Sequence, residues 1–147
     1  MHFEDTVVIN APQELVWETL TNPEQVSQCA PGINSLEIID DGRKFRAGVE
    51  VGLGSVKAKF IMEVEWTSLE SPHHAVLSAH GTTTGSAVDV TSEMTLVPEG
   101  VGSTNLQWEA DVHIVGTIAS IAMRFAPSIT KKLAAEFFEN VKGMTEK

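Results

Sequence analysis

The clearest regularity in this chain is an alternation of apolar and polar residues that runs through its middle. In the longest stretch, apolar side chains occupy every second position from Ala58 to Trp66. A period of two residues places alternate side chains on opposite faces of a β-strand, so each such stretch predicts a strand with one buried face. The stretches lie at residues 44–51, 56–66, 75–79, 88–96 and 105–114.

Before these strands, the chain predicts another strand and two short helices. Residues 2–10 alternate, with Phe3 and Ile9 on the apolar face. Pro12 is expected at the first position of a helix that runs through Leu20, because the missing N–H of proline would have no partner there. A second short helix, PEQVSQCA, follows directly, and a Pro-Gly pair ends it.

The last element is a long helix. Apolar residues recur at helical spacing from about Thr117, which we expect to cap the helix, to about Gly143. Pro127 lies inside this pattern. Proline removes one backbone hydrogen bond and crowds the preceding turn, so we expect a kink or a break at this position.

This order of elements predicts an α+β protein that forms a single domain over residues 1–147. We expect a curved antiparallel sheet of about seven strands, two short helices after the first strand, and a long C-terminal helix packed on the concave face. A sheet with one apolar face must be covered, and only the last helix is long enough to cover it. A space can remain between the sheet and this helix.

The negative net charge of the chain argues against nucleic acid as a binding partner. Ten Lys and Arg residues stand against twenty Asp and Glu residues, which gives a net charge of −10. Most of this surface would repel a nucleic acid, so we expect no nucleic-acid partner. Arg124, Lys131 and Lys132 form only a small basic group, which is typical of a solvated helix face.

The N-terminus and the cysteine content indicate the compartment. The first ten residues lack a basic stretch followed by an apolar run, so no secretory signal is expected. A single cysteine, Cys29, excludes an internal disulfide and fits a reducing environment. Cys29 lies near the end of a short helix, where the helix dipole disfavours a thiolate. We therefore interpret Cys29 as a buried structural residue in a cytoplasmic protein.

Catalytic and metal-binding patterns are weak. None of the five histidines stands in an HxxxH or HExxH arrangement. Two carboxylate pairs, Glu63 with Glu65 and Glu109 with Asp111, fall on the polar faces of their strands and are expected in solvent. The sequence therefore predicts no catalytic residue, no metal site and no cofactor.

One apolar stretch, Ile114–Ala126, allows two interpretations. It is too short to span a bilayer. It can simply cover the sheet, or its inner face can line a ligand cavity while outer residues such as Met123 form a gate or a docking patch. On the second interpretation, the predicted ligand-binding residues are Trp17, Phe45, Phe60, Met62, Leu77, Val90, Met94, Leu106, Trp108, Val112, Ile118, Ile121, Ala122, Phe125 and Ile129.

Several segments carry a resemblance to a known family. They are INAPQELVWETLTNPE, CAPGI, GLGSVKAKF, LQWEADVHIVGTIASIAMR and KKLAAEFFENV, and they cover nearly the whole chain. With these segments the sequence resembles the carbon monoxide dehydrogenase G-subunit family, within the START-like (helix-grip, SRPBCC) superfamily. The last two segments are the most specific of the five.

The resemblance implies a helix-grip fold with a cavity and an accessory role. Members of the family are associated with molybdenum-containing carbon monoxide dehydrogenase, with its recruitment to the membrane, and with carrying quinone. The resemblance therefore implies a non-catalytic carrier that holds a quinone or a lipid between sheet and helix. It also implies a molybdenum hydroxylase as partner, transient membrane contact, and a peripheral position at the inner face of the membrane.

Two alternatives remain open at this stage. The chain could be a docking subunit with a filled core and no ligand. It could also be an enzyme of the cyclase or hydrolase type, because START-like relatives include cyclases. An enzyme would need a polar group that points into the cavity, and the cavity-side candidates by alternation are few, Ser86 and Ser92 among them.

Overall fold

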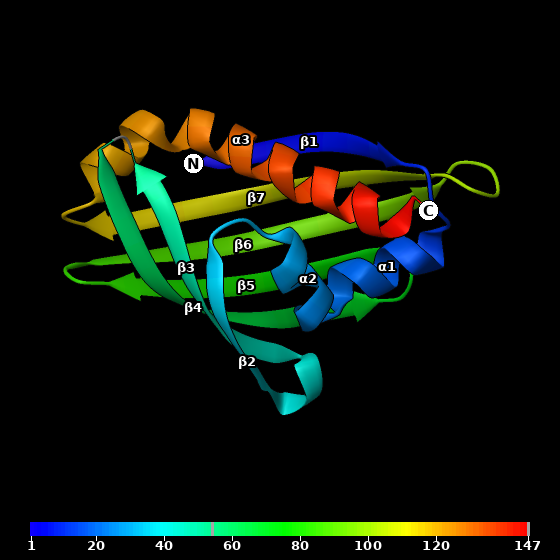
Figure 1. Ribbon diagram of the computed structural model, residues 1–147, viewed down its shortest axis with the longest axis horizontal. Coiled ribbons are helices and arrows are strands. Elements are labelled where there is room, and N and C mark those ends of the chain that lie inside the picture. The colour runs from blue at the N-terminus through cyan, green and yellow to red at the C-terminus, as the bar shows by residue number, and fades with distance from the viewer. Residues whose placement is uncertain (54, 147) are drawn as a thin grey trace.

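The computed structural model describes residues 1–53 and 55–146, which form one antiparallel sheet and a set of helices on one side of it (Figure 1). The sheet has seven strands in the order β1-β7-β6-β5-β4-β3-β2. The elements are β1 (His2–Ile9), α1 (Gln13–Thr21), α2 (Pro23–Cys29), β2 (Ile33–Ile39), a short 3-10 turn (Asp40–Gly42), β3 (Lys44–Leu53), β4 (Val56–Glu70), β5 (His74–Thr83), β6 (Ser86–Pro98), β7 (Thr104–Gly116) and α3 (Ala119–Thr145).

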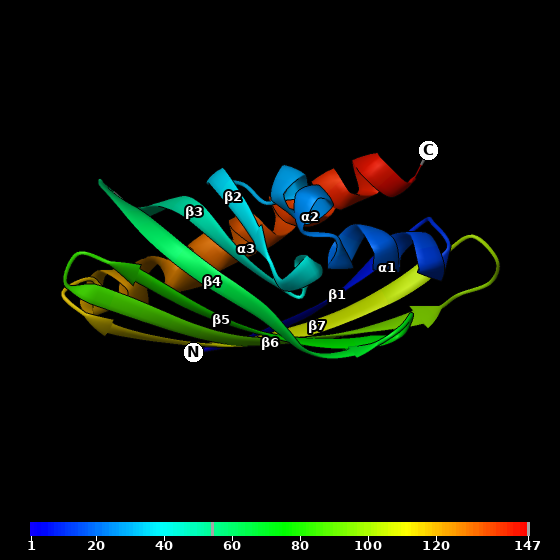
Figure 2. The same ribbon diagram turned by 90° about the horizontal axis from the view of Figure 1, so that it is seen from below.

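The sheet is strongly curved, and all three α-helices lie on its concave side (Figure 2). Helix α3 runs along the trough, and α1 and α2 pack beside its C-terminal half (Figure 1). The predicted α+β architecture with a helix-grip arrangement is therefore confirmed. The alternation also holds along β4, where Ala58 and Trp66 are buried while Ile61 is 52% exposed.

The sequence pattern did not identify β2 as a strand. Its half-buried residues are Ile33, Leu36 and Ile39, a spacing of three rather than two. The reason is an irregularity in its pairing with β3, where the register shifts between Ile33 and Ser35. An extra residue of this kind turns the following side chains to the other face, which accounts for the interval of three between Ile33 and Leu36.

The ends of two helices differ from the prediction. Pro12 is the N-cap of α1 with an extended backbone, rather than its first helical residue. Helix α3 begins at Ala119, after Ile118 as N-cap, so Thr117 does not cap it. Instead the Ser86 hydroxyl oxygen accepts the Ile118 N–H at 3.0 Å.

Helix α3 continues through Pro127, so the predicted break is absent from the span Ala119–Thr145. Ala122 and Ile129, on either side of Pro127, both face the sheet. In addition, the Ser128 hydroxyl donates to the Phe125 carbonyl at 3.1 Å, next to the interrupted turn. Helix α3 thus tolerates the loss of the backbone hydrogen bond that Pro127 removes.

The densest part of the core lies at one end of the trough. Ile9, Val16, Leu106 and Val141 join β1, α1, β7 and α3 there, and each is at most 1% exposed. Burying each such side chain contributes roughly 1.5–3 kcal/mol. A second, smaller cluster around Ala58 lies elsewhere under α3.

Cys29 is part of the dense end of the core. It is fully buried, its sulfur lies 3.2 Å from that of Met144, and its carbonyl accepts a hydrogen bond from Asn140 at 2.8 Å. Burial raises the pKa of the Cys29 thiol above its ordinary value, because the thiolate would lose its hydration. The structural interpretation of this residue is confirmed.

The Pro-Gly pair after α2 turns the chain into the sheet. Gly32 has a φ of +85°, and its carbonyl accepts the Glu50 N–H at 2.9 Å. A Cβ at this position would collide with the Glu50 carbonyl oxygen. Both the backbone angle and the close approach of β3 therefore require glycine here.

We expect Gly32→Ala to destabilise the protein. The left-handed backbone alone costs an L-residue about 1–2 kcal/mol, and the collision with Glu50 adds to that cost. Urea unfolding would measure the change. Gly102→Ala is the control, since a Cβ there meets no atom within 4 Å. Equal stability of the two variants would contradict the role assigned to Gly32.

We also expect Cys29 to resist thiol reagents in the folded protein. Because its pKa is raised and its side chain is fully buried, Cys29 can react only when the structure opens locally or unfolds. The labelling rate of the folded protein should therefore be at least about a hundredfold below that of the unfolded chain. Labelling with a chromogenic disulfide at pH 8, with and without guanidinium, checks this. Similar rates in both conditions would show that Cys29 is accessible.

Candidate ligand cavity

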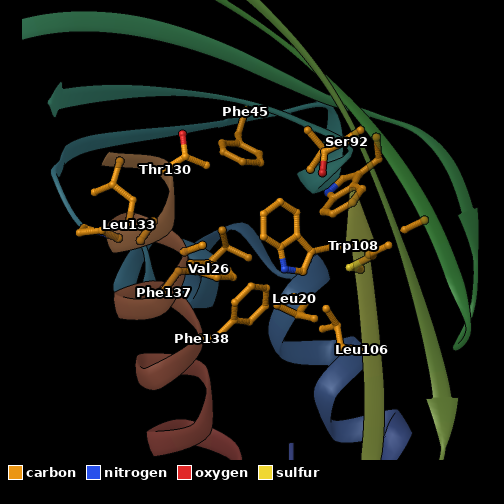
Figure 3. Close-up of a pocket in the computed structure, with 17 residues that line it drawn as sticks. Leu20, Val26, Phe45, Ser92, Leu106, Trp108, Thr130, Leu133, Phe137 and Phe138 are labelled. Atoms are coloured by element: carbon orange, nitrogen blue, oxygen red, sulfur yellow. The ribbon is translucent and has the colours of Figure 1, made fainter. Parts of the chain in front are cut away.

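Two apolar cavities lie between the concave face of the sheet and the helices. We call the first the tryptophan cavity; its volume is about 420 Å³, and its walls come from α1, α2, β3 to β7 and α3 (Figure 3). Its lining residues are Leu20, Val26, Ala30, Pro31, Phe45, Trp66, Ala75, Leu77, Ser92, Met94, Leu106, Trp108, Thr130, Leu133, Ala134, Phe137 and Phe138.

The second cavity, which we call the valine cavity, has a volume of about 440 Å³ and lies under the N-terminal half of α3. Its lining residues are Met1, Phe3, Val26, Ile33, Phe45, Ala47, Val49, Val51, Phe60, Met62, Val64, Leu77, Val88, Val90, Val112, Ile114, Ile118, Ala122, Ala126, Ile129, Thr130 and Leu133. Both volumes fall in the range of small-molecule sites, roughly 300–1,000 Å³.

The two cavities are neighbours. They share lining residues from α2, β3, β5 and α3, namely Val26, Phe45, Leu77, Thr130 and Leu133. A molecule longer than one cavity can therefore extend into the other if these side chains part. Figure 3 shows Phe45, Thr130 and Leu133 together at one side of the tryptophan cavity.

The lining is apolar and uncharged. Among the described residues that line the two cavities, none is Asp, Glu, His, Lys or Arg. The Ser92 hydroxyl belongs to the tryptophan cavity and donates to the Glu109 carbonyl at 3.1 Å. The remaining polar side chains are the Thr130 hydroxyl and the indoles of Trp66 and Trp108.

Both indoles of the tryptophan cavity carry an unpartnered donor. The Nε1 atoms of Trp66 and Trp108 are buried, and neither has a hydrogen-bond partner within residues 1–53 and 55–146. The Trp108 indole extends from β7 across the cavity, toward Phe138 of α3 (Figure 3). The two ring centroids are 6.2 Å apart, and Phe137 packs edge-on against Phe138 at 5.1 Å.

Most of the residues predicted as ligand-binding line one or both cavities. Phe45, Leu77, Met94, Leu106 and Trp108 line the tryptophan cavity. Phe45, Phe60, Met62, Leu77, Val90, Val112, Ile118, Ala122 and Ile129 line the valine cavity. The alternation of the strands thus places these side chains on the concave face, while their binding of a ligand stays a prediction.

Three predicted residues line neither cavity. Trp17 is buried in the dense core, in the same cluster as Trp66, and borders a surface groove that includes Glu18 and Arg43. Ile121 packs against the cluster around Ala58, and the Phe125 ring lies 5.4 Å from the Arg124 guanidinium. Helix α3 presents residues 122, 126 and 129 to the cavity, so positions one residue earlier are turned about 100° away.

Sequence reasoning missed part of the tryptophan cavity. Leu133, Phe137 and Phe138 line it from α3, and Val26 lines it from α2. The helical spacing of Leu133 and Phe137 was a usable signal, since it places them on one face of the final helix. The position of Val26 depends on how α2 packs on the sheet, which the sequence pattern does not encode.

The predicted carboxylate pairs lie on the convex face, away from the cavities. Glu63 accepts a hydrogen bond from Arg46 at 2.9 Å, which lowers the pKa of Glu63 and raises that of Arg46. At the other edge, hydrogen bonds to Asp111 at 2.8 Å and to Glu4 raise the pKa of His2. The carboxylates of both predicted pairs are thus largely open to solvent, as the sequence predicted.

One group of side chains on this face has donor atoms close enough to share a metal ion. Those of His2, Glu4 and Glu109 lie within 4.8 Å of one another, and all three residues are exposed. Exposed acidic groups are common without an ion.

Among the described helices, none combines the length and apolar character needed to cross a membrane.

Solved structures with the same fold come from several bacteria. A conserved protein from Geobacillus kaustophilus is 26% identical, covers 98% of this chain and 94% of its own, and has a TM-score of 0.90. A START superfamily protein from Mycobacterium smegmatis is 18% identical, with coverages of 99% and 97% and a TM-score of 0.69. An aromatase/cyclase from a Streptomyces species is 17% identical, with coverages of 99% and 93% and a TM-score of 0.75.

The fold is therefore START-like, and the two more distant structures show the fold alone. A comparison with curated proteins finds no match. The family of the carbon monoxide dehydrogenase G-subunit (CoxG) matches residues 6–145, which span the sheet and all three helices. The chain thus belongs to the CoxG family, that of the carbon monoxide dehydrogenase G-subunit.

Proposed function

We propose that this protein is a non-catalytic carrier and accessory protein of a molybdenum hydroxylase similar to carbon monoxide dehydrogenase. It binds a hydrophobic small molecule, a quinone or a lipid, between the sheet and α3. The observation that carries this proposal is the pair of adjoining cavities with uncharged, mostly hydrocarbon walls. Such walls suit an apolar ligand and offer little to a charged one.

Binding would come mainly from burial of apolar surface. Each Å² of ligand surface removed from water contributes roughly 25 cal/mol, before the cost of ordering the ligand is subtracted. The indoles of Trp66 and Trp108 supply the largest flat surfaces of the tryptophan cavity, Phe60 lines the valine cavity, and Phe45 lines both. A long hydrocarbon chain would fit this scheme because it gains free energy from every buried methylene.

Family membership supports the accessory role, since the CoxG family takes its description from one of the subunits of carbon monoxide dehydrogenase. The proposal places the protein in the cytoplasm, with transient contact at the inner face of the membrane. Met123 on α3 is 69% exposed and follows Ala122, which lines the valine cavity. An exposed apolar side chain beside a cavity suits the transfer of a ligand between a membrane and the protein.

An enzymatic role has less support. General acid or base catalysis needs a titratable side chain within reach of the substrate, and the described cavity walls hold none. Of the two serines considered as cavity-side candidates, Ser86 is the first residue of β6, lines neither cavity, and accepts the Ile118 N–H beside the start of α3. Ser92 does line the tryptophan cavity, but its hydroxyl hydrogen is held by a backbone carbonyl.

The direct experiment is native mass spectrometry of gently purified protein, followed by organic extraction of what is bound. We expect a stoichiometric quinone or lipid. A protein that is free of ligand when isolated from its own host, and that comes down with a large hydroxylase, would instead favour a docking role without a ligand.

We expect Ala134→Phe to weaken binding of the neutral dye Nile red by at least about tenfold, or ~1.4 kcal/mol. Ala134 lines the tryptophan cavity, so an added ring occupies the space that the ligand would use. Ala135→Phe is the matched control, because the next residue of α3 is exposed and lines neither cavity. Fluorescence titration measures the affinity. A folded Ala134→Phe variant with unchanged dye binding would count against a ligand site in this cavity.

A further inference from the structure

We propose that the free edge of β1 is a docking site for an extended segment of a partner protein, and that this segment carries a lysine or arginine opposite Glu4. The segment pairs with β1 as an eighth strand and lies along the groove between β1 and α3. This inference goes beyond the proposed carrier function and does not depend on what the two cavities hold.

The backbone of β1 is open on one side. Strand β1 forms one edge of the sheet, with β7 as its neighbour (Figure 1). Met1 and Val112 exchange both of their backbone hydrogen bonds, each at 2.8 Å. Because such pairs alternate along an antiparallel ladder, the even-numbered residues from His2 to Val8 direct their N–H and C=O groups away from β7. An extended peptide is the group that pairs with a row of this kind.

Two carboxylates limit the open edge. The Asp5 carboxylate accepts the Thr6 N–H at 2.8 Å, and the Glu146 carboxylate accepts the Asn10 N–H at 2.8 Å, just after the strand. The second bond ends the open edge near Val8. The first bond must be exchanged for one to a carbonyl of the incoming segment, so the edge rejects segments that bring no further interaction.

A groove of about 720 Å³, which we call the edge groove, lies between β1 and α3. Phe3 and Val7 line it from the strand, and Ala135 and Phe138 line it from the helix. Alternate side chains of an added strand enter a groove in this position, and such contacts give strand addition its specificity. Phe138 also lines the tryptophan cavity, so the docked segment lies against one wall of that cavity.

The edge groove compensates for the release of Asp5. Lys131 and Lys142 of α3 line this groove together with Asp5. The carboxylate that gives up the Thr6 N–H therefore stays in a groove that contains two cations of its own chain. The side chains that the segment directs into the groove need no charge, and small or branched apolar residues fit there.

The charge that the partner must bring follows from the convex face. Glu93, Glu109 and Glu4 lie directly opposite one another on β6, β7 and β1. Like charges in cross-strand pairs are destabilising. Among the described residues, the ion-pair partners of these three carboxylates are histidines, His2 and His74. The row ends at Glu4 on the open edge, so a cation on the next strand relieves the repulsion.

A second copy of the chain fits this edge poorly. Antiparallel pairing of residues 2–8 with the same residues of a second copy would place Asp5 opposite Asp5 and Glu4 opposite Thr6. The first of these contacts adds a like-charge pair, and the second brings no cation to Glu4. A basic segment of a different protein satisfies both the backbone edge and the row of carboxylates.

The test uses the full-length protein labelled with ¹⁵N and a short synthetic peptide in which valine and threonine alternate around a central lysine. We expect a Kd of about 100 µM or tighter. The amide protons of Glu4 and Val8 should move downfield and exchange more slowly with water. Those of Phe3 and Val7, which already pair with β7, should change little. This alternation distinguishes an added strand from unspecific attraction.

Reversal of charge tests the requirement for a cation. Replacement of the peptide lysine by glutamate should weaken binding at least about fivefold, and Glu4→Lys should abolish or reverse this preference. Glu65→Lys is the matched control, because Glu65 is an exposed glutamate of β4, away from the β1 edge. An equal loss of lysine-peptide binding in both variants would show attraction by the overall negative charge and would overturn the assignment to Glu4.

Three further outcomes would contradict the docking site. Absence of binding at about 1 mM lysine peptide overturns it. Binding without the alternating response of the β1 amides places the peptide elsewhere. A concentration-dependent dimer of the protein alone, with protected amides at Glu4 and Val8, assigns the edge to a second copy. The carrier function is tested by ligands of the cavities and stands or falls separately.

Discussion

The whole structure depends on one constraint: a strongly curved sheet with a single apolar face must be covered, and one helix does most of the covering. A helix with its side chains is about 10–12 Å across, and it lies along the middle of a trough that is seven strands wide. It can cover the whole apolar face only where other elements fill the remaining width of the trough.

At one end α1 and α2 do so, and Ile9, Val16 and Val141 are fully buried between them and the sheet. Toward the N-terminal half of α3 no second helix is present among the described residues, and the space under it remains as the valine cavity. The cavities thus follow from the geometry of coverage, and the tryptophan cavity borders directly on the dense core, with which it shares Leu20, Trp66, Ala75 and Leu106.

Ionisable side chains of the strands are also distributed unequally between the convex and the concave face of the sheet. Between residues 60 and 123 the sequence holds no Lys or Arg, yet it contributes acidic residues and histidines to four strands. Because strands alternate, these polar residues all turn to the convex face, where His2, His74 and His80 pair with carboxylates of neighbouring strands. The concave face is left without ionisable groups in the described cavity walls. Walls of this kind suit neutral molecules, and the described lining offers no titratable group for proton transfer, so the cavities are more compatible with the proposed carrier than with an enzyme.

The alternation of the strands and the spacing of the last helix were enough to predict the architecture, because both patterns record which face is buried. They were also enough to select concave-face residues such as Phe60, Val90 and Trp108. They failed where burial depends on a local irregularity or on packing at a distance. The register shift near Ser35 disguised β2, and the rotation of α3 about its own axis excluded Ile121 and Phe125 from the cavity. Trp17 is buried as predicted, but it packs in the dense core and lines neither cavity. Burial can be inferred from sequence, whereas the direction in which a helix presents its buried side depends on contacts that only the folded chain defines.

The indoles of Trp66 and Trp108 bring these arguments together. Each fills a wall of the tryptophan cavity as well as any large apolar residue would, so the ring accounts for packing but leaves the N–H unexplained. In an interior selected for stability alone, a donor without an acceptor is a defect that phenylalanine or leucine would remove. The two indole nitrogens are not the only buried polar atoms without a partner among the described residues, since Nδ1 of His74 and Oδ1 of Asn105 share that condition outside the cavity. Trp66 also belongs to the dense core and Leu106 lines the cavity, so the dense core and the tryptophan cavity meet at these side chains. A polar atom without a partner costs stability wherever it is buried, but only at a cavity wall can a bound molecule supply the missing partner.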